Sequence, residues 1–153
     1  LGEDITYSGT VAAAMEGTLL GIPSIALSQA RTYGENVRWA ATEHHADSVI
    51  RKLVAQEWPH NVLMNVNFPD APPAEVGKTE ITVQGRRKIG DAITSGRDPR
   101  GYDYVWIGTD RNEDPSFKDS DLKAVNEGRI SVTPLCLDLT HRRSMAKLRE
   151  VFS

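Results

Sequence analysis

The sequence predicts an α/β fold in which helices cover a parallel sheet. Patterns of helix and strand alternate along the first part of the chain, and this order is typical of parallel α/β sheets. The predicted strands are short apolar runs, as expected for strands that are buried on both faces. The 153 residues suffice for one domain with a core of its own.

The first helix is predicted over residues 9–20, after a loop formed by residues 1–7. Ser8 occupies the N-cap position, and three alanines with Met15 supply strong helix formers. Gly21 has the position of a C′ glycine, and the proline that follows shortly after it forbids any continuation. The helix therefore begins at a Ser-Gly-Thr sequence.

Two predicted strands, residues 24–28 and 62–68, flank the longest helical pattern of the chain, residues 35–57. This helix is expected to carry a stripe made by Trp39, Ala46, Val49, Ile50, Leu53 and Val54. The second strand places Asn65 and Asn67 on one face near its end, where ligands gather in α/β sheets. Strand-end capping and turn formation are the favoured roles of these two asparagines.

A Pro-Pro pair marks a boundary after the second strand, because two prolines stiffen the chain and break the sheet rhythm. Residues 1–70 are assigned to the α/β core, and residues 71–153 to an arm, a return strand and a C-terminal helix. The elements predicted after the boundary are strand 80–84, a long β-hairpin of residues 88–94 and 102–107, strand 129–135 and helix 141–152.

The bulk composition excludes some classes of partner. The formal net charge of −3 does not suggest a nucleic-acid duplex as partner, and no apolar run reaches the length of a membrane span. A single cysteine, Cys136, fits a reducing cytoplasm, and its place in an apolar strand suggests inert packing. Because the chain starts with Leu1 and a helix, we expect that amino-terminal strands of the sheet precede it.

The Ser8-Gly9-Thr10 sequence at the start of the first helix is a candidate phosphate site. A helix N-terminus offers backbone N–H groups and the positive end of a dipole, and both hydroxyls can donate. The local pattern alone favours the simpler role, in which Ser8 only caps a core helix.

An acidic loop and a histidine pair are weaker candidates for metal sites. Asp110, Asn112, Asp114 and Asp121 stand at positions one, three, five and twelve of a calcium loop, but Pro115 occupies the position that requires glycine. A solvated acidic loop is the favoured interpretation. The adjacent His44 and His45 point in different directions on a helix and cannot share a metal ion.

Arginines and a carboxylate–imidazole pair complete the candidates. Salt bridging is favoured for Arg86 and Arg87, whereas Arg97 and Arg100 stay open between substrate contacts and contacts of the arm. Asp138 and His141 lie where the last strand gives way to the last helix. Capping or hinge chemistry is favoured there over catalysis, with Thr140 as the cap and Asp138 accepting from the His141 ring.

A set of motifs runs through the whole chain in a fixed order. The first is Tyr-Ser-Gly-Thr-Val-Ala-Ala-Ala-Met-Glu-Gly at residues 7–17, followed by Gly-Ile-Pro-Ser-Ile-Ala-Leu-Ser at residues 21–28. The others are found at residues 65–69, 84–87, 98–101, 104–108, 124–128, 131–135 and 138–141. In order and spacing these motifs resemble the SurE family, the survival-protein nucleotidases.

The resemblance implies a Rossmann-like three-layer α/β/α sandwich with an extended hairpin arm and a C-terminal helix that serve oligomerisation. It also implies metal-dependent hydrolysis of nucleoside 5′- and 3′-monophosphates, with phosphate held at Ser8, Gly9 and Thr10 beside the metal. The metal is Mg²⁺ or Mn²⁺, one per subunit, and its family ligands, an Asp pair, a Ser and an Asn, precede Leu1. No catalytic residue or metal ligand is therefore assigned in this chain, which is expected to be inactive alone.

The resemblance implies a homodimer or tetramer joined by the arms. We expect Tyr104 and Trp106 to be buried between the subunits, because large aromatic side chains are the usual anchors of such contacts. An isolated two-stranded hairpin is marginal in water, which favours the same arrangement. The alternative function is a nucleotide-sensing or assembly module without turnover.

Overall fold

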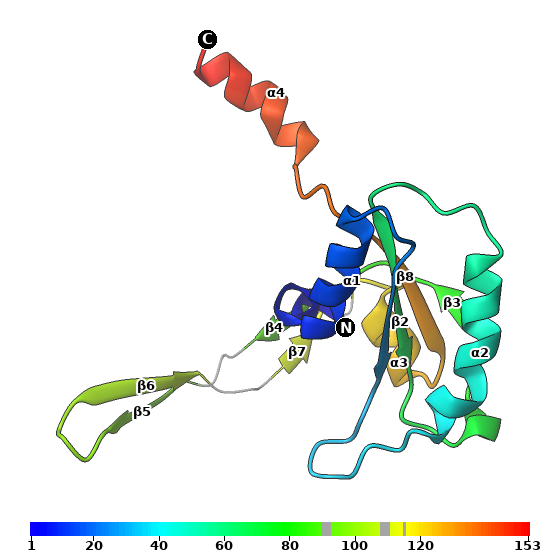
Figure 1. The fold of residues 1–153 in the computed structure, drawn as a ribbon. Coiled ribbons are helices and arrows are strands. Elements are labelled where there is room, and N and C mark those ends of the chain that lie inside the picture. Colours follow the sequence, from blue (N-terminus) through cyan, green and yellow to red (C-terminus); the bar gives the residue numbers. More distant parts are fainter. Residues whose placement is uncertain (90–92, 108–110, 115) are drawn as a thin grey trace.

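The computed structural model describes residues 1–89, 93–107, 111–114 and 116–153 (Figure 1). Its centre is a four-stranded sheet with the strand order β1–β2–β8–β3. The four strands are β1 (Ile25–Gln29), β2 (Val62–Phe68), β3 (Thr79–Ile81) and β8 (Ile130–Cys136). The α/β class predicted from the sequence is confirmed, and the sheet draws strands from both sides of the Pro-Pro pair.

The sheet is mixed, so the expectation of a wholly parallel sheet was wrong. β1 pairs with β2 and β3 with β8 in parallel, whereas β2 and β8 are antiparallel. Each parallel pair is joined by a connection that contains a helix, α2 (Ala40–Val54) or α3 (Asp121–Asn126). β2 belongs to the first of these pairs and β8 to the second. No helical connection joins β2 directly to β8, so these two strands can run antiparallel.

Helices lie on both faces of the sheet, with α1 (Gly9–Leu19) on one side and α2 on the other (Figure 1). On the α1 face the core consists of Val11, Ala14, Ala26, Leu63 and Leu135. On the α2 face it consists of Val49, Val66, Phe68, Ile130 and Val132. These two apolar clusters make the sheet the middle layer of a sandwich.

The ends of α1 follow the local sequence. The Ser8 side chain caps the first turn, and Gly21 has a φ of 78°. The N–H of Gly21 donates to the Thr18 carbonyl and that of Ile22 to the Gly17 carbonyl, the two bonds of a Schellman motif. The predicted loop before α1 is instead a 3₁₀-helix, η1 (Gly2–Tyr7).

The second helix is shorter than predicted, because α2 begins at Ala40 rather than near residue 35. Trp39 and Val54, which were placed in the stripe, are exposed, whereas Val49 and the fully buried Ala41 face the core. The segment before α2 stays a loop because its side chains bond to Asp70, beyond β2.

In the residues described after β3, the predicted hairpin is found as two short antiparallel ladders. β4 (Arg87–Ile89) pairs with β7 (Arg111–Glu113), and β5 (Ile93–Arg97) pairs with β6 (Asp103–Ile107). β5 extends through part of the predicted turn, and the chain reverses between Asp98 and Tyr102. The β5–β6 hairpin projects away from the sheet (Figure 1).

Further details complete the fold. A short 3₁₀-helix, η2 (Pro73–Glu75), begins at the second proline of the Pro-Pro pair. The helix α3 was not predicted from the sequence. Cys136 is exposed at the end of β8, so the expected inert packing of its thiol is wrong. The last helix, α4 (Arg142–Val151), extends away from the sheet (Figure 1). Within the described ranges, no helix is both long and apolar enough to cross a membrane.

Candidate functional site

The N-terminus of α1 is capped and faces solvent. Ser8 Oγ accepts a hydrogen bond from the Val11 N–H at 3.2 Å, so the capping role is present. Gly9 and Thr10 are exposed, and a Cβ added to Gly9 meets no atom within 4 Å. The first N–H groups of a helix have no acceptor within it, so those of Gly9 and Thr10 are directed outward.

A second feature is a cavity of about 600 Å³ beyond the carboxyl ends of β1 and β2. Its volume is that of a small-molecule site. The residues that line it come from the start of the chain, the two strand ends, the β1–α2 loop, β4 and α3: Leu1, Ser28, Gln29, Ala30, Arg31, Tyr33, Asn67, Arg87, Val125 and Asn126.

Gln29 fixes the wall of this cavity that the two strand ends form. Its Nε2 donates to the carbonyls of Pro69 at 2.7 Å and of Ala30 at 3.0 Å, and its Oε1 accepts from the Thr42 hydroxyl at 2.6 Å. One side chain thus ties β1, the end of β2 and α2 together. No local pattern indicates this role, because Pro69 and Thr42 are remote in the sequence and Ala30 lies outside any motif.

Asn67 and Asn65 lie within β2 and not at a turn, so strand-end capping does not describe them. Asn67 is only 3% exposed and Asn65 2%, and the Nδ2 atom of each has no hydrogen-bond partner. Asn67 lines the strand-end cavity, whereas Asn65 does not. An amide donor without an acceptor is costly when buried, and the Asn67 donor therefore stands at the cavity wall ready for a ligand.

Arg87 enters the cavity wall from β4 as part of an acid–base cluster. Its guanidinium pairs with Asp4, and its backbone N–H donates to Glu3 Oε2 at 3.1 Å. The salt bridging predicted for Arg87 is confirmed. Arg86 instead lies over the Phe117 ring, with 5.4 Å between its Cζ and the ring centroid.

Asp70 holds the loop that carries Tyr33 to the mouth of the cavity. Its Oδ2 accepts from the Thr32 N–H at 2.9 Å and the Thr32 hydroxyl at 2.8 Å, and its Oδ1 accepts from Arg38 Nε at 2.9 Å. Hydrogen bonds from Arg38 and then from Thr32 hold the pKa of Asp70 below its ordinary value. Tyr33 is nevertheless 93% exposed.

Replacing Asp70 with asparagine is expected to loosen this loop. Amide hydrogen exchange of residues 31–38 should become roughly tenfold faster at pH 7, because charge-assisted bonds are lost. The pKa of Asp70 is lower in the folded than in the unfolded state, so the wild-type bonds stabilise the fold above the ordinary carboxyl value of about 4. This contribution disappears as the pH falls through the lowered pKa.

The matched control is Asp47→Asn, which removes the exposed pair between Asp47 and Arg51 on α2. Its loop exchange should match that of the wild type. Equal exchange rates in the Asp70 variant and the wild type would contradict the anchoring role.

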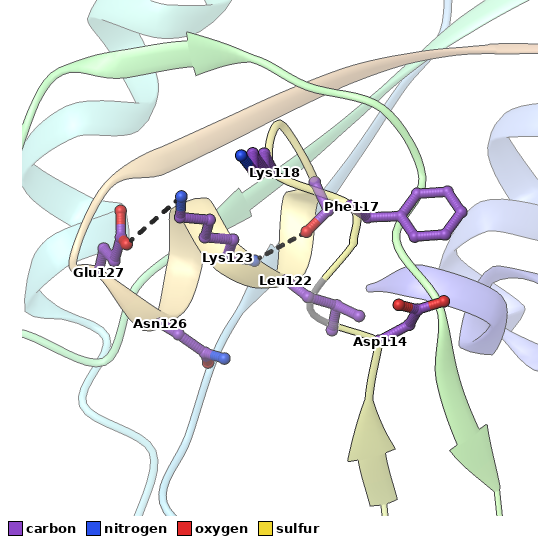
Figure 2. Close-up of a pocket in the computed structure, with 8 residues that line it drawn as sticks. Asp114, Phe117, Lys118, Leu122, Lys123, Asn126 and Glu127 are labelled. Atoms are coloured by element: carbon purple, nitrogen blue, oxygen red, sulfur yellow. Dashed lines mark hydrogen bonds and ion pairs between the residues drawn. The ribbon is translucent and has the colours of Figure 1, made fainter.

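A neighbouring cavity of about 540 Å³ lies around α3 and shares Asn126 with the strand-end cavity (Figure 2). Phe117 and Leu122 provide its apolar wall, and Lys123 and Glu127 form an ion pair at 3.9 Å across one turn of the helix. Lys123 therefore already has a carboxylate partner, and Lys118 is the second lysine of the wall.

The remaining sequence candidates lie elsewhere. Arg97 pairs with Asp103 at 2.9 Å on the exposed hairpin, and Arg100 is exposed in its turn. Neither lines the strand-end cavity. Both therefore belong to the arm in this structure.

The carboxylate–imidazole contact predicted before α4 is wrong. Asp138 accepts from the Thr140 N–H at 2.9 Å and pairs with Arg142, and these groups, Thr140 first, lower its pKa. The His141 ring instead contacts the Ser144 hydroxyl at 2.6 Å, and His141 rather than Thr140 is the N-cap residue. The Asp138 carboxylate is thus occupied by the Thr140 N–H and the Arg142 guanidinium, and the His141 ring bonds to Ser144 instead.

The calcium-like spacing also fails to form a site. Asp110 and Pro115 lie outside the described residues, and Asp121, expected in a solvated loop, is fully buried and accepts from backbone N–H groups. Across the described ranges, no group of three or more His, Cys, Asp or Glu side chains is placed to hold a metal ion.

Comparisons with known proteins agree with the fold and the motifs. The family model described as survival protein SurE matches residues 1–91. The 5′-nucleotidase SurE of Paramagnetospirillum magneticum is 60% identical over 152 residues, which cover 99% of this chain and 58% of that relative. The 5′-nucleotidase SurE of Rhodospirillum rubrum is 50% identical over 157 residues, with coverages of 99% and 59%.

A solved structure extends the similarity to three dimensions. The crystal structure of the SurE protein from Aquifex aeolicus matches with a TM-score of 0.84 at 36% identity, over 100% of this chain and 61% of that chain. The chain thus spans less than two thirds of the length of these relatives.

Proposed function

This chain belongs to the survival protein SurE family, and from this premise we propose that the complete protein hydrolyses nucleoside 5′- and 3′-monophosphates to nucleoside and phosphate. Relatives named 5′-nucleotidase support the 5′ activity. The observation that carries the proposal is the exposed N-terminus of α1 at Ser8, Gly9 and Thr10. In the alternative function, a nucleotide-sensing or assembly module, the same site would bind a nucleotide without hydrolysing it.

In the proposed site, α1 holds the phosphate of the substrate. The N–H groups of Gly9 and Thr10 and the Thr10 hydroxyl donate to phosphate oxygens, and the helix dipole favours their negative charge. Ser8 keeps this turn in place through its bond from Val11, at 3.2 Å. Preorganised donors of this kind stabilise the charge that builds up during phosphoryl transfer.

The proposal includes a divalent metal ion, Mg²⁺ or Mn²⁺, one per subunit. No cluster of potential ligands occurs in the described part of this chain, so the residues present do not fit the ion. We therefore assign its ligands to sequence other than these 153 residues and expect the 153-residue chain alone to be inactive.

The assembly proposed is a homodimer or tetramer that forms through the β5–β6 hairpin and α4. Both elements extend from the sheet and expose apolar side chains, among them Trp106 on the hairpin and Leu148 on α4, and the exposed Phe152 follows α4 directly. A cytoplasmic location belongs to the same proposal.

Replacing Thr10 with valine in the complete protein tests the phosphate site. Valine keeps the shape of threonine and removes the hydroxyl. Loss of a hydrogen bond to a charged group costs about 1.5–3 kcal/mol, so kcat/KM for AMP should fall roughly tenfold or more. The measurement is phosphate release in the presence of Mn²⁺.

The control is Thr6→Val, in which the lost hydroxyl bonds to the Glu3 carbonyl and not to the proposed ligand. Its kcat/KM should stay within about threefold of the wild type, as is usual for exposed substitutions away from a site. Unchanged kinetics in the Thr10 variant would remove this loop from the site. A wild type that binds AMP without releasing phosphate would favour the sensing module.

A further inference from the structure

We propose that the strand-end cavity binds the nucleoside part of the substrate, with Asn67 donating to an acceptor on the base or ribose and Tyr33 stacking on the base. This inference rests on the proposed nucleotidase function and adds the second half of its substrate site. The cavity has about 600 Å³, which is ample for a nucleoside.

Asn67 provides the donor. The side chain is 3% exposed and its Nδ2 has no acceptor, although the residue lines the cavity. A buried amide donor without a partner is destabilising, and a ligand acceptor that reaches it gains a hydrogen bond and relieves that cost. Ring nitrogens and carbonyls of bases, and ribose hydroxyls, are such acceptors.

Tyr33 provides an aromatic surface at the mouth. Tyr33 is 93% exposed while it lines the cavity, so its ring is accessible to a ligand there. Its loop is not loose, because Asp70 binds Thr32, the residue before it, through two hydrogen bonds of 2.8 and 2.9 Å. An aromatic ring on an anchored loop is suited to base stacking, which tolerates any base.

Arg87 in the cavity wall is already engaged by carboxylates. Its guanidinium pairs with Asp4, and its backbone N–H donates to Glu3. This pairing makes Arg87 less available to a phosphate, whereas an uncharged nucleoside needs no free cation.

One short element joins the wall of the cavity to the start of α1. Leu1 lines the cavity, and η1 connects it directly to Ser8 at the start of α1. At about 2 Å per residue, a six-residue 3₁₀-helix spans about 12 Å, which is comparable with the length of a nucleoside monophosphate. The phosphate at α1 and the base in the cavity can therefore belong to one molecule.

The test uses two variants of the complete protein, Tyr33→Ala and Asn67→Leu, with adenosine and inorganic phosphate as separate probes. Each variant should raise the KM for AMP and the calorimetric Kd for adenosine at least about fivefold, as expected for a lost stacking or hydrogen-bond partner. The inhibition constant of phosphate should stay within about twofold.

The matched control is Asn65→Leu, which makes the same change on the same face of β2, at a buried asparagine that does not line the cavity. It should leave adenosine binding unchanged. Tyr33→Ala preserves the test if Asn67→Leu does not fold, because an exposed side chain contributes little to stability.

Adenosine binding that is unchanged in Tyr33→Ala, or equally weakened in Asn65→Leu, would overturn the proposal. A parallel loss of phosphate affinity would also overturn it, since the cavity would then hold the phosphate. Failure of the proposed function has a different signature, because the wild type would release no phosphate from AMP whatever its affinity for adenosine.

Discussion

Replacing Asp121 with alanine is expected to lower the free energy of unfolding by about 3 kcal/mol or more. The side chain is fully buried at the start of α3. Its Oδ2 accepts from the Gly2 N–H at 2.7 Å, and its Oδ1 accepts from the N–H groups of Gly85 and Leu122, both at 2.8 Å. Alanine leaves three buried donors without an acceptor, at about 1–3 kcal/mol each.

The carboxylate of Asp121 joins three segments that are far apart in sequence: η1, the loop before β4, and α3. Its loss should therefore release η1, which leads directly to the proposed phosphate site. Urea denaturation of the complete protein measures the change as a shift of the midpoint.

Two further variants separate the causes. Asp121→Asn keeps the volume and one acceptor oxygen, so it should lose less stability than the alanine variant. Asp119→Ala removes an exposed carboxylate two residues away and should change stability by less than about 0.5 kcal/mol. A stable Asp121→Ala protein would show that the three N–H groups find other acceptors.

Replacing Trp106 with alanine is expected to weaken self-association of the complete protein by about 2 kcal/mol or more, roughly 30-fold in Kd. Trp106 is 67% exposed on a two-stranded hairpin that projects from the sheet. Two-stranded hairpins are marginal in water, and exposed tryptophans at interfaces are frequent hot spots. Tyr104 lies on the same face, two residues away, with its ring against Gly96.

Light scattering over a dilution series measures the association, with Val105→Ala as the control. Val105 is exposed on the opposite face of the same strand, so its truncation should leave the oligomer intact. A monomeric wild type would refute the arm hypothesis. If the Trp106→Ala and Val105→Ala variants associate equally tightly, the arm hypothesis stands but Trp106 is not its anchor.

Local sequence determined the elements whose signals lie within a few residues. β2 spans residues 62–68 as predicted, and α1 begins after Ser8 and ends before Gly21. In each case the deciding interaction is short-range: a cap three residues away, a glycine with positive φ, or the period of a buried strand. The capping role of Ser8 was readable for the same reason, whereas the phosphate role of Ser8, Gly9 and Thr10 came from the family resemblance and stays a prediction.

Tertiary structure decided the features whose partners are distant. α2 begins at Ala40 because Asp70, 32 residues beyond Arg38, holds the preceding segment as a loop. Asp121 has the spacing of a solvated acidic loop but is buried, because its acceptors serve Gly2 and Gly85.

The cavity follows the same rule. Asn67 and Tyr33 lie 34 residues apart in the sequence, and only the pairing of β1 with β2 brings the loop and the strand end to one edge of the sheet. Periodicity and capping report on neighbours in the chain, whereas a hydrogen bond to a remote residue leaves no trace in local composition. The cap of α1 could therefore be predicted from the local sequence, whereas the nucleoside half of the proposed site required the fold.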